Sequence, residues 1–252
     1  MSAAAPRMES AEYPKLAAVE DRMWYFRALH GHLLRELDLG LGPSAEVLDA
    51  GCGTGGLIRR LTRVRPGWRW SAVDRSSLAL ELARARCPDA VEWAQASVEA
   101  LPFADGAFDA VVSADVLYHV DDDAAALREF FRVLRPGGSV VLNVPAYPWL
   151  WSYHDEAVHS RRRYGRGEVL AKLAAAGLVR ARATHWNALP LPLIVLRRKL
   201  LPAGRGGSDV RLHPAPVEAA FRAAMAAEAS WITRMGRLPV GCSILAAAVK
   251  PA

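Results

Sequence analysis

The sequence has few cysteines and no long uninterrupted apolar run. Three cysteines, Cys52, Cys87 and Cys242, are too few for a disulfide framework and show no metal-ligand spacing, so we expect a reducing, cytoplasmic setting and no metal. Residues 1–10 lack the apolar core of a secretory signal. The most apolar stretch, residues 188–201, contains two prolines and three consecutive basic residues, and it is too short to span a bilayer. These absences argue against secreted disulfide-rich domains and membrane-spanning proteins.

The composition is that of one globular domain with room for an insertion. Dividing 252 residues by about 150 residues per domain gives roughly 1.7 domains. Apolar residues make up 52% of the chain and charged residues 23%, which excludes a disordered protein. The formal charge of +6 comes from 32 Lys and Arg against 26 Asp and Glu and is mostly arginine. Such a balance allows an anionic ligand or membrane surface and identifies neither.

Strands and helices alternate along most of the chain. Apolar residues at helical spacing predict an N-terminal helix over residues 13–39. The predicted strands are 45–50, 70–74, 90–95, 108–114, 139–144, 179–184 and 243–249. The predicted helices between them follow the first strand to about residue 64 and then cover 76–86, 121–134 and 168–176, with a turn at 136–138. This alternation predicts a doubly wound α/β fold with helices on both faces of the sheet.

About 55 residues before the last strand do not fit the alternation. They contain the apolar and basic stretch 188–201, a glycine-rich linker and a second predicted helix near 216–234. A structureless loop of that length is uncommon, so we expect a helical insertion that covers the substrate. The predicted organisation is an N-terminal helical cap over 1–43, an α/β domain over 44–187 and 241–252, and an insertion or lid over 188–240.

A glycine-rich loop follows the first strand and opens the next helix. Residues 49–55 are D-A-G-C-G-T-G, in which the glycines allow a tight turn and a close approach of the backbone to a ligand. Asp74, at the end of the second strand, can accept hydrogen bonds from both ribose hydroxyls. These features alone fit NAD as well as other adenosine ligands. Asp49 distinguishes NAD from other adenosine ligands, because its carboxylate would repel a pyrophosphate but suits an ammonium and a sulfonium.

The loop resembles the first motif of the class I S-adenosylmethionine-dependent methyltransferases, type 11-like. The segments that agree in order and spacing are A-V-D-R-S at 72–76, A-L-P-F at 100–103, F-D-A-V-V at 108–112, L-Y-H-V at 117–120 and L-R-P-G-G at 134–138. The resemblance covers about residues 46–178. It implies a Rossmann-like seven-stranded sheet with an antiparallel last strand, and S-adenosyl-L-methionine as the cofactor.

The resemblance also implies which residues contact the cofactor. Asp49 would act near the methionine amine, Asp74 would hold the ribose, and Arg75 would flank the adenine. Ser97 stands where the family often has an acidic residue beside the adenine amine, and its hydroxyl can still accept a hydrogen bond. The full predicted cofactor set is Tyr25, Arg27, Asp49, Gly51, Cys52, Gly53, Gly55, Asp74, Arg75, Ser97, Val98, Ala114 and Asp115.

The connection after the fifth strand, residues 143–164, gathers aromatic, acidic and basic side chains. Together with W-Y-F-R at 24–27, it resembles a subgroup of bacterial methyltransferases in which Tyr25 and Arg27 would close over the cofactor. Methyl transfer from a sulfonium is an in-line displacement, and an acceptor that carries a proton can need a base. We expect His154 to be that base or to orient the substrate, with Asp155 fixing its tautomer.

His119 is a further catalytic candidate. The candidate substrate-binding residues are Tyr147, Trp151, His159, Arg162, Arg163 and Tyr164. Of these, the last three would grip an anionic or polar substrate. Two alternatives stay open for this connection: its side chains pair only with one another or with solvent, or His154, Asp155 and His159 bind a metal, which their spacing supports only weakly.

Several functions remain open on the sequence alone. The first is methyl transfer to oxygen, nitrogen or carbon of a small polar, anionic or lipid-linked metabolite. A nicotinamide-dependent reductase is disfavoured by Asp49 and by the lack of a Tyr-x-x-x-Lys pair, and the third alternative is a non-catalytic binder of the cofactor. Nucleic acid is disfavoured as a partner, because D-V-L-Y at 115–118 replaces the N/D-P-P-Y/F motif of base-acting relatives.

Residues 188–201 either pack as a lid helix or contact a membrane surface. The sequence does not indicate an oligomeric state.

Overall fold

A seven-stranded mixed sheet forms the centre of the computed structural model, which describes residues 12–87, 90–200 and 208–252. The strands are β1 (Ala45–Ala50), β2 (Trp68–Asp74), β3 (Glu92–Gln95), β4 (Phe108–Ala114), β5 (Leu134–Pro145), β6 (Val179–Trp186) and β7 (Ser243–Val249). Their order is β3-β2-β1-β4-β5-β7-β6, and β7 runs antiparallel to both of its neighbours. This order confirms the predicted fold class.

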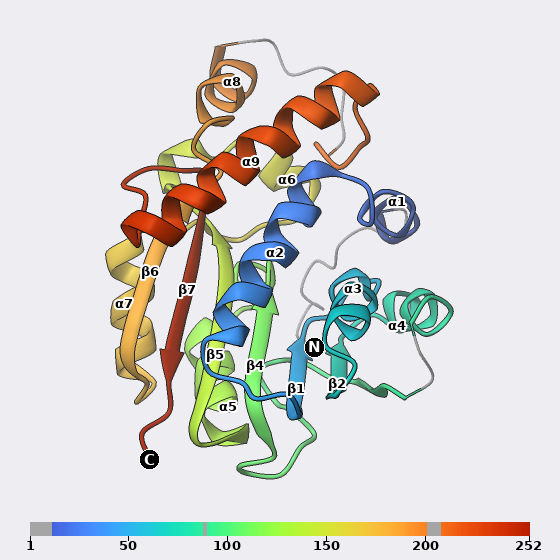
Figure 1. Ribbon diagram of the computed structural model, residues 1–252, viewed down its shortest axis with the longest axis vertical. Helices are drawn as coiled ribbons and strands as arrows, with labels where there is room; N and C mark the ends of the chain where they lie inside the picture. The colour runs from blue at the N-terminus through green and yellow to red at the C-terminus, as the bar shows by residue number, and fades with distance from the viewer. Residues whose placement is uncertain (1–11, 88–89, 201–207) are drawn as a thin grey trace, which may run out of the picture.

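Helices cover both faces of the sheet (Figure 1). The α-helices are α1 (Glu12–Val19), α2 (Trp24–Asp38), α3 (Gly56–Val64), α4 (Ser77–Arg84), α5 (Asp123–Val133), α6 (Tyr153–Ala157), α7 (Arg166–Ala175), α8 (Leu191–Val195) and α9 (Ala215–Met235). A 3₁₀ turn spans Pro148–Leu150, and a π-helical turn, η2 (Leu196–Leu200), continues α8. One hydrophobic core packs α5 and α7 against the sheet, and a second packs α2, α3 and α9 against the opposite face.

The central strand β4 forms where the sequence predicts a continuous apolar run, because both faces of a parallel sheet are buried. The bounds of β4 and β7 agree with the prediction, whereas β2 begins two residues earlier than expected. The short apolar stripe of α5, which includes Leu127 and Phe130, is buried against the sheet at helical spacing. Ser76 caps α4, since its side chain accepts a hydrogen bond of 3.2 Å from the backbone N–H of Ala79.

Two local predictions are wrong. The single N-terminal helix expected over 13–39 is broken between α1 and α2, because buried Glu20 turns inward to Thr54 and Arg86. Residues 136–138, predicted as a turn, lie inside β5. The backbone explains this, because the N–H of Gly137 donates to the carbonyl of Lys250 and the N–H of Lys250 donates to the carbonyl of Gly138.

The inserted residues cover the carboxyl ends of the parallel strands. In Figure 1 the arrowheads of β4 and β5 point toward α6, α8, α9 and the N-terminal end of α2. The helical character expected for 188–240 is present in α8, η2 and α9, while the predicted linker at 203–208 lies almost wholly outside the described residues. The insertion and the N-terminal helices thus lie at the edge of the sheet where the parallel strands end.

Candidate functional site

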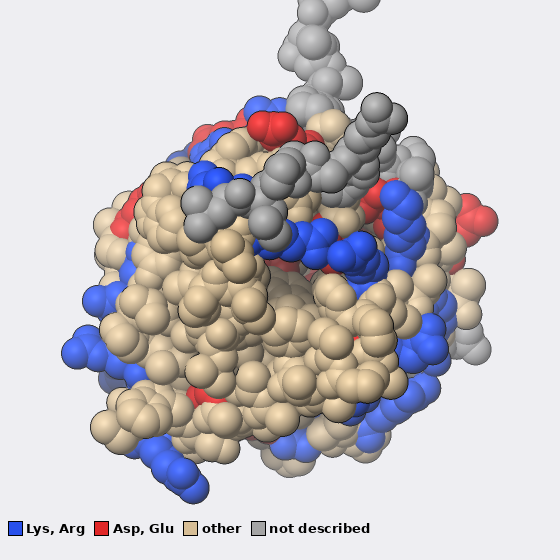
Figure 2. All heavy atoms as spheres, turned by 90° about the horizontal axis from the view of Figure 1, so that it is seen from above, with Lys and Arg blue, Asp and Glu red and all other residues tan. Residues whose placement is uncertain are grey.

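A cavity of about 630 Å³ opens above the carboxyl ends of β1, β2 and β4. Its wall is built from the loops that follow these strands, from α1 and α2, and from the insertion. Figure 2, viewed from above, shows the molecule hollowed at this end, with basic side chains beside the opening. The carboxyl ends of parallel strands meet at one edge of an open α/β sheet, which is where such folds bind ligands.

Asp49, at the end of β1, is a buried acid with an unused oxygen. Its side chain is 1% exposed, and its Oδ1 has no hydrogen-bond partner among the described residues. Burial, followed by the nearby charges of Asp74 and Glu20, raises the pKa of Asp49 to about 8. A buried acceptor without a partner is costly unless a ligand satisfies it, so this side of the cavity suits a cationic group.

The loop after Asp49 brings backbone to the cavity. Gly51 has a φ of +91° and Gly53 a φ of +51°, a region that side chains disfavour. A Cβ at Gly51 would also collide with the side chain of Val116. The carboxylate of Asp74 holds this loop, because it accepts hydrogen bonds of 2.9 Å from the N–H groups of Gly53 and Ser76. Burial raises the pKa of Asp74, and these two N–H donors counter part of the increase.

Asp115, just beyond β4, is the second acid that faces the cavity. It has a φ of +59°, and its carboxylate accepts hydrogen bonds from the Tyr25 hydroxyl at 2.9 Å and from Asn143 Nδ2 at 2.8 Å. The indole of Trp186 in turn donates to Asn143 Oδ1 at 2.7 Å. Burial raises the pKa of Asp115 to about 6, against the opposing effect of these hydrogen bonds. A strained, buried acid at a cavity is a common feature of functional sites.

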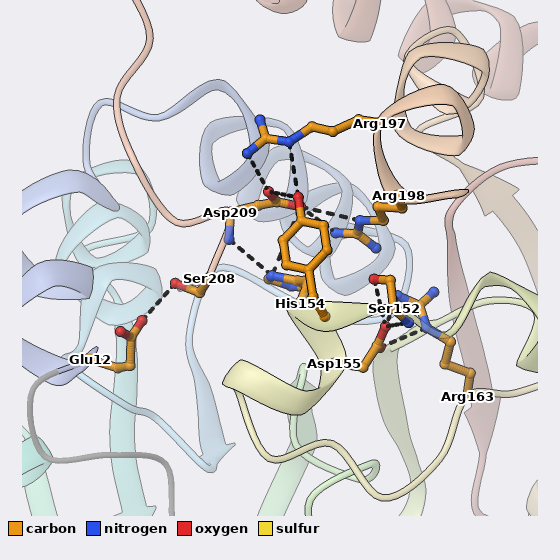
Figure 3. A network of polar contacts seen from close by, with 10 residues as sticks. Glu12, Ser152, His154, Asp155, Arg163, Arg197, Arg198, Ser208 and Asp209 are labelled. Atoms are coloured by element: carbon orange, nitrogen blue, oxygen red, sulfur yellow. Dashed lines mark hydrogen bonds and ion pairs between the residues drawn. The ribbon is translucent and has the colours of Figure 1, made fainter. Parts of the chain in front are cut away.

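A second part of the cavity wall, near α6 and η2, carries the arginines Arg163, Arg197 and Arg198 (Figure 3), and we call it the basic end. Arg197 and Arg198, from η2, both contact the carboxylate of Asp209. The nearest atom pairs are Arg197 Nη2 to Oδ1 at 3.1 Å and Arg198 Nη2 to Oδ2 at 2.9 Å. The Tyr153 hydroxyl also donates to Asp209 Oδ1 at 3.0 Å. Burial acts to raise the pKa of Asp209, but the charge of Arg198 leads the groups that hold it below its ordinary value.

His154 lies beside this basic end. Its Nδ1 accepts a hydrogen bond of 3.0 Å from the backbone N–H of Asp209. Burial, and then the charge of Arg198, lower the pKa of His154 to about 4. The ring is therefore neutral at pH 7, and because Nδ1 accepts, Nε2 carries the proton. This tautomer makes His154 a donor at Nε2, which favours the orienting role over the role of a general base.

Comparisons with known proteins identify the domain. The profile of a family described as "Methyltransferase domain" matches residues 48–142. A malonyl-[acyl-carrier protein] O-methyltransferase of Hahella chejuensis is 40% identical over 144 residues, which cover 54% of this chain and 52% of that protein. The ubiquinone/menaquinone biosynthesis C-methyltransferase UbiE of the same organism is 39% identical over 109 residues, covering 41% and 44%. Residues 48–142 carry a methyltransferase domain.

A solved structure extends the likeness in fold over nearly the whole chain. The methyltransferase in a complex with the Trm112 methyltransferase activator of Haloferax volcanii has a TM-score of 0.65 at 23% identity, covering 96% of this chain and 94% of that chain. The sequence match is shorter, since the aligned segment spans 44%, 44% and 52% of the first three curated relatives. The family resemblance predicted from the motifs is thereby confirmed.

Two solved structures of similar fold, which are 18% and 21% identical in sequence, contain S-adenosyl-L-methionine or its demethylated product, S-adenosyl-L-homocysteine. The residues present fit this group. The unpartnered Oδ1 of Asp49 suits an ammonium, and Gly53, where an added Cβ would meet only Leu16 at 3.8 Å, leaves the backbone open to a ligand. The negative charge around Asp74 and Asp115 suits a cationic sulfur compound and disfavours a pyrophosphate.

The structure brings about two thirds of the predicted site residues to the cavity of the methyltransferase domain. The predicted residues that line it are Tyr25, Asp49, Gly51, Cys52, Gly53, Asp74, Arg75, Val98, Ala114, Asp115, His119, His154, Asp155 and Arg163. The predicted residues that do not line it are Arg27, Gly55, Ser97, Tyr147, Trp151, His159, Arg162 and Tyr164. Contact with a ligand stays a prediction for the first set.

Two residues predicted to contact the cofactor, Gly55 and Ser97, contact other parts of the protein instead. Gly55 is the residue before α3 and packs against α4, where an added Cβ would lie 2.7 Å from Cys87 Sγ. The hydroxyl of Ser97 bonds to Glu99 instead of the cavity, accepting from its N–H at 3.2 Å and donating to its Oε2 at 3.0 Å. Both chain neighbours of Ser97, Ala96 and Val98, line the cavity.

The predicted pairing of Asp155 with His154 is wrong. Asp155 is buried and forms a two-point ion pair with Arg163, with Nε to Oδ1 at 2.7 Å and Nη2 to Oδ2 at 3.1 Å. The N–H of Ser152 also donates to Asp155 Oδ2 at 2.9 Å, so the carboxylate is occupied. Asp209, from the insertion, provides the partner of His154 instead.

The two arginines and the tyrosine predicted to grip a substrate are held within the fold. Arg163 Nη1 donates to the carbonyl of Ala146 at 2.9 Å, in addition to its pair with Asp155. Arg162 donates to the carbonyls of residues 120 and 121. The Tyr164 hydroxyl is buried and donates to Asp123 Oδ2 at 2.9 Å. These contacts brace the connection after β5, and the predicted grip on a substrate has no support from their placement.

Several cavity residues were missed by sequence reasoning. They are Glu20, His30, Arg197, Arg198, Asp209 and Phe221. The run Arg197–Lys199 was predicted to lie in the insertion that covers the substrate, either in a lid helix or at a membrane surface, but it was not predicted as a site residue. Asp209 follows a linker and has no motif around it, so nothing local marks it. Among the residues that the structure describes, no group of three or more His, Cys, Asp and Glu is arranged to hold a metal ion.

Proposed function

We propose that the protein is an S-adenosyl-L-methionine-dependent methyltransferase whose acceptor is a small molecule with an anionic group. The observation that carries this proposal is the polarity of the single cavity described above. Its sheet-loop end presents Asp49, Asp74 and Asp115, and its insertion end presents Arg197 and Arg198. A cationic donor and an anionic acceptor placed end to end would bring their reacting groups to the middle of this cavity.

At the acidic end, the chain's residues would bind and align the donor. S-adenosyl-L-methionine supplies the activated methyl group when bound. Asp49 would accept from its ammonium, and Asp74, already fixed by two backbone N–H groups, would retain lone pairs for the ribose. Asp115, held by Tyr25 and Asn143, would place negative charge beside the sulfonium. These are positioning and electrostatic roles, which suit an in-line displacement.

At the basic end, His154 would orient the acceptor. Its Nε2–H can donate to an acceptor oxygen or anion, because Nδ1 is engaged by Asp209. The related proteins named above are an O-methyltransferase and a C-methyltransferase, so they leave the accepting atom open. Within the predicted cap over 1–43 and insertion over 188–240, helices α1, α2, α8 and α9 contribute residues to the cavity wall and would act as the covers that exclude water from the reacting groups.

Calorimetric titration tests the first step. We expect binding of S-adenosyl-L-methionine and none of NADH, because Asp49 opposes a pyrophosphate. Release of S-adenosylhomocysteine with a panel of carboxylate- and phosphate-bearing metabolites then tests turnover. Binding of NADH alone would replace the proposal with the reductase alternative. Binding of S-adenosyl-L-methionine without turnover on any anionic or neutral metabolite would favour the non-catalytic binder.

Peripheral membrane contact through residues 188–201 is a second, weaker candidate. Leu189, Leu193 and Leu196 are 56%, 58% and 44% exposed, which leaves an apolar surface beside the cavity. However, Arg198 turns inward to Asp209 and its side chain is only 10% exposed, so it contributes little to an outward basic edge; the side chain of Arg197 is 42% exposed. No helix in the described ranges is long and apolar enough to cross a membrane. Co-sedimentation with anionic vesicles tests the contact, and recovery of all protein in the supernatant would remove it.

A further inference from the structure

We propose that Arg197 and Arg198, with Asp209 between them, form a subsite for one carboxylate group of an amphiphilic acceptor. The inference rests on the proposed function and specifies the acceptor class. Two guanidiniums share one internal carboxylate here, so the cluster keeps one net positive charge (+2 − 1) inside a cavity. A dianionic group would exceed that charge, whereas a single carboxylate would balance it.

Donors remain available for such a group. Arg198 uses Nε and Nη2 on Asp209 Oδ2, and Arg197 uses Nε on the Tyr153 hydroxyl and Nη2 on Asp209 Oδ1. Within the described ranges, the Nη1 atoms of these two arginines have no hydrogen bond or ion pair. Each guanidinium carries five N–H donors in a planar fork, which matches a carboxylate. The side chain of Arg198 is 10% exposed, so its charge is not dissipated in bulk water.

Asp209 keeps the arginines in place. Its carboxylate joins Arg197, Arg198 and Tyr153, while its backbone N–H donates to His154 Nδ1. This double role explains the geometry in Figure 3, where His154 and the two arginines lie around one acid. An acceptor carboxylate bound at the arginines would therefore lie next to the ring that we expect to orient the acceptor.

The neighbouring wall is apolar, which defines the rest of the ligand. Leu193 and Ile194 line the cavity about one helical turn before Arg197 and Arg198. Val158 and Val210 line the cavity from the segments next to His154 and Asp209. A carboxylate with an apolar chain or ring would bury its hydrocarbon part against these side chains. A small, fully polar acid such as acetate would lack this contribution.

Calorimetry with octanoate tests the subsite in the protein saturated with S-adenosylhomocysteine. We expect octanoate to bind, octanamide and acetate to bind at least tenfold more weakly, and phosphate to be weaker than octanoate. R198A should weaken octanoate binding at least tenfold while leaving S-adenosylhomocysteine affinity unchanged. K199A is the matched control, because it removes an adjacent positive charge whose Nζ bonds to the Trp151 carbonyl and does not line the cavity.

D209N tests the subsite by a gain of octanoate binding, which a misfolded variant could not show. Asparagine keeps the backbone donor to His154 and one side-chain acceptor but removes the competing charge, so octanoate should bind several-fold more tightly and phosphate should gain even more. Equal losses in R198A and K199A, unchanged or weaker octanoate binding in D209N, or no octanoate binding to the wild type would each overturn the subsite. Failure to bind S-adenosylhomocysteine in the wild type would instead overturn the proposed function.

Discussion

The Tyr25 hydroxyl donates a hydrogen bond of 2.9 Å to Asp115 Oδ2, joining α2 to the end of β4 across 90 positions of the chain. Asn143 donates to the other oxygen of the same carboxylate, and Trp186 donates to Asn143. The ring of Tyr25 also stacks on Trp186 with centroids 5.2 Å apart. One covering helix is thus connected to three strands through a single buried acid at the cavity.

Tyr25→Phe should shift the pH dependence of cofactor binding. Burial raises the pKa of Asp115 to about 6, and the Tyr25 hydroxyl is the first of the groups that lower it. Without that donor the carboxylate is harder to ionise, so its pKa should rise by about one further unit. As the pH is lowered, Tyr25→Phe should therefore begin to lose affinity for S-adenosyl-L-methionine at a higher pH than the wild type does. Calorimetry from pH 5 to 8 measures the shift; Asp115→Asn should lack this step, and an unmoved step in Tyr25→Phe would contradict the assignment.

Asp49→Asn should raise the stability of the folded protein at pH 8 and weaken its binding of the cofactor. The folded protein holds the proton of Asp49 more tightly than the unfolded chain, because its pKa rises from 3.8 to about 8. Wild-type stability therefore declines, through this group, as pH rises from about 4 to 8, by up to about 1.4 kcal/mol per pH unit. The variant escapes that decline. Urea denaturation should find it more stable than wild type at pH 8 but not at pH 4.

The same variant should bind S-adenosyl-L-methionine at least tenfold more weakly, because an amide cannot supply negative charge to an ammonium. Retained affinity would remove Asp49 from the cofactor site. A variant that is less stable than wild type at both pH values would contradict the burial argument.

Gly51→Ala should destroy the cofactor loop, whereas Gly167→Ala should be harmless. Gly51 has a φ of +91°, and its added Cβ would meet the side chain of Val116. Gly167 lies in α7 with nothing within 4 Å of an added Cβ, and alanine is favoured over glycine in helices by up to about 1 kcal/mol. Thermal unfolding and calorimetry with S-adenosyl-L-methionine compare the two. Normal binding by Gly51→Ala would show that the loop does not approach the cofactor closely.

Breaking the pair of Arg163 and Asp155 should lower stability more than any surface pair does. Their side chains are 3% and 2% exposed, so Arg163→Met leaves a buried carboxylate without its cation. Loss of one partner of a buried pair costs about 3–5 kcal/mol. Arg128→Ala is the control, because its pair with Asp122 is exposed and should contribute nothing measurable. A normal midpoint in urea for Arg163→Met, with altered turnover only, would restore the substrate-binding role.

Local sequence patterns were sufficient for much of the fold. The continuous apolar run at 108–114 predicts β4 with its observed bounds, because a strand buried on both faces has no polar alternation. Asp49 and Asp74 could be placed at one cavity from sequence, because each ends a parallel strand and such ends meet at one edge. The break at Glu20 could not be predicted, since its partners Thr54 and Arg86 lie on other elements.

By itself, the sequence determined the α/β alternation, the glycine loop and the acids at the strand ends, because each depends on periodicity or on neighbours in the chain. Only the tertiary structure decided which charged side chains face the cavity. Arg163 turns into the fold because Asp155 and the carbonyl of Ala146 satisfy it there. Arg197 and Arg198 turn toward the cavity because Asp209, beyond the linker, draws them together. The direction of a long basic side chain depends on its partner's position in space, which no local pattern records.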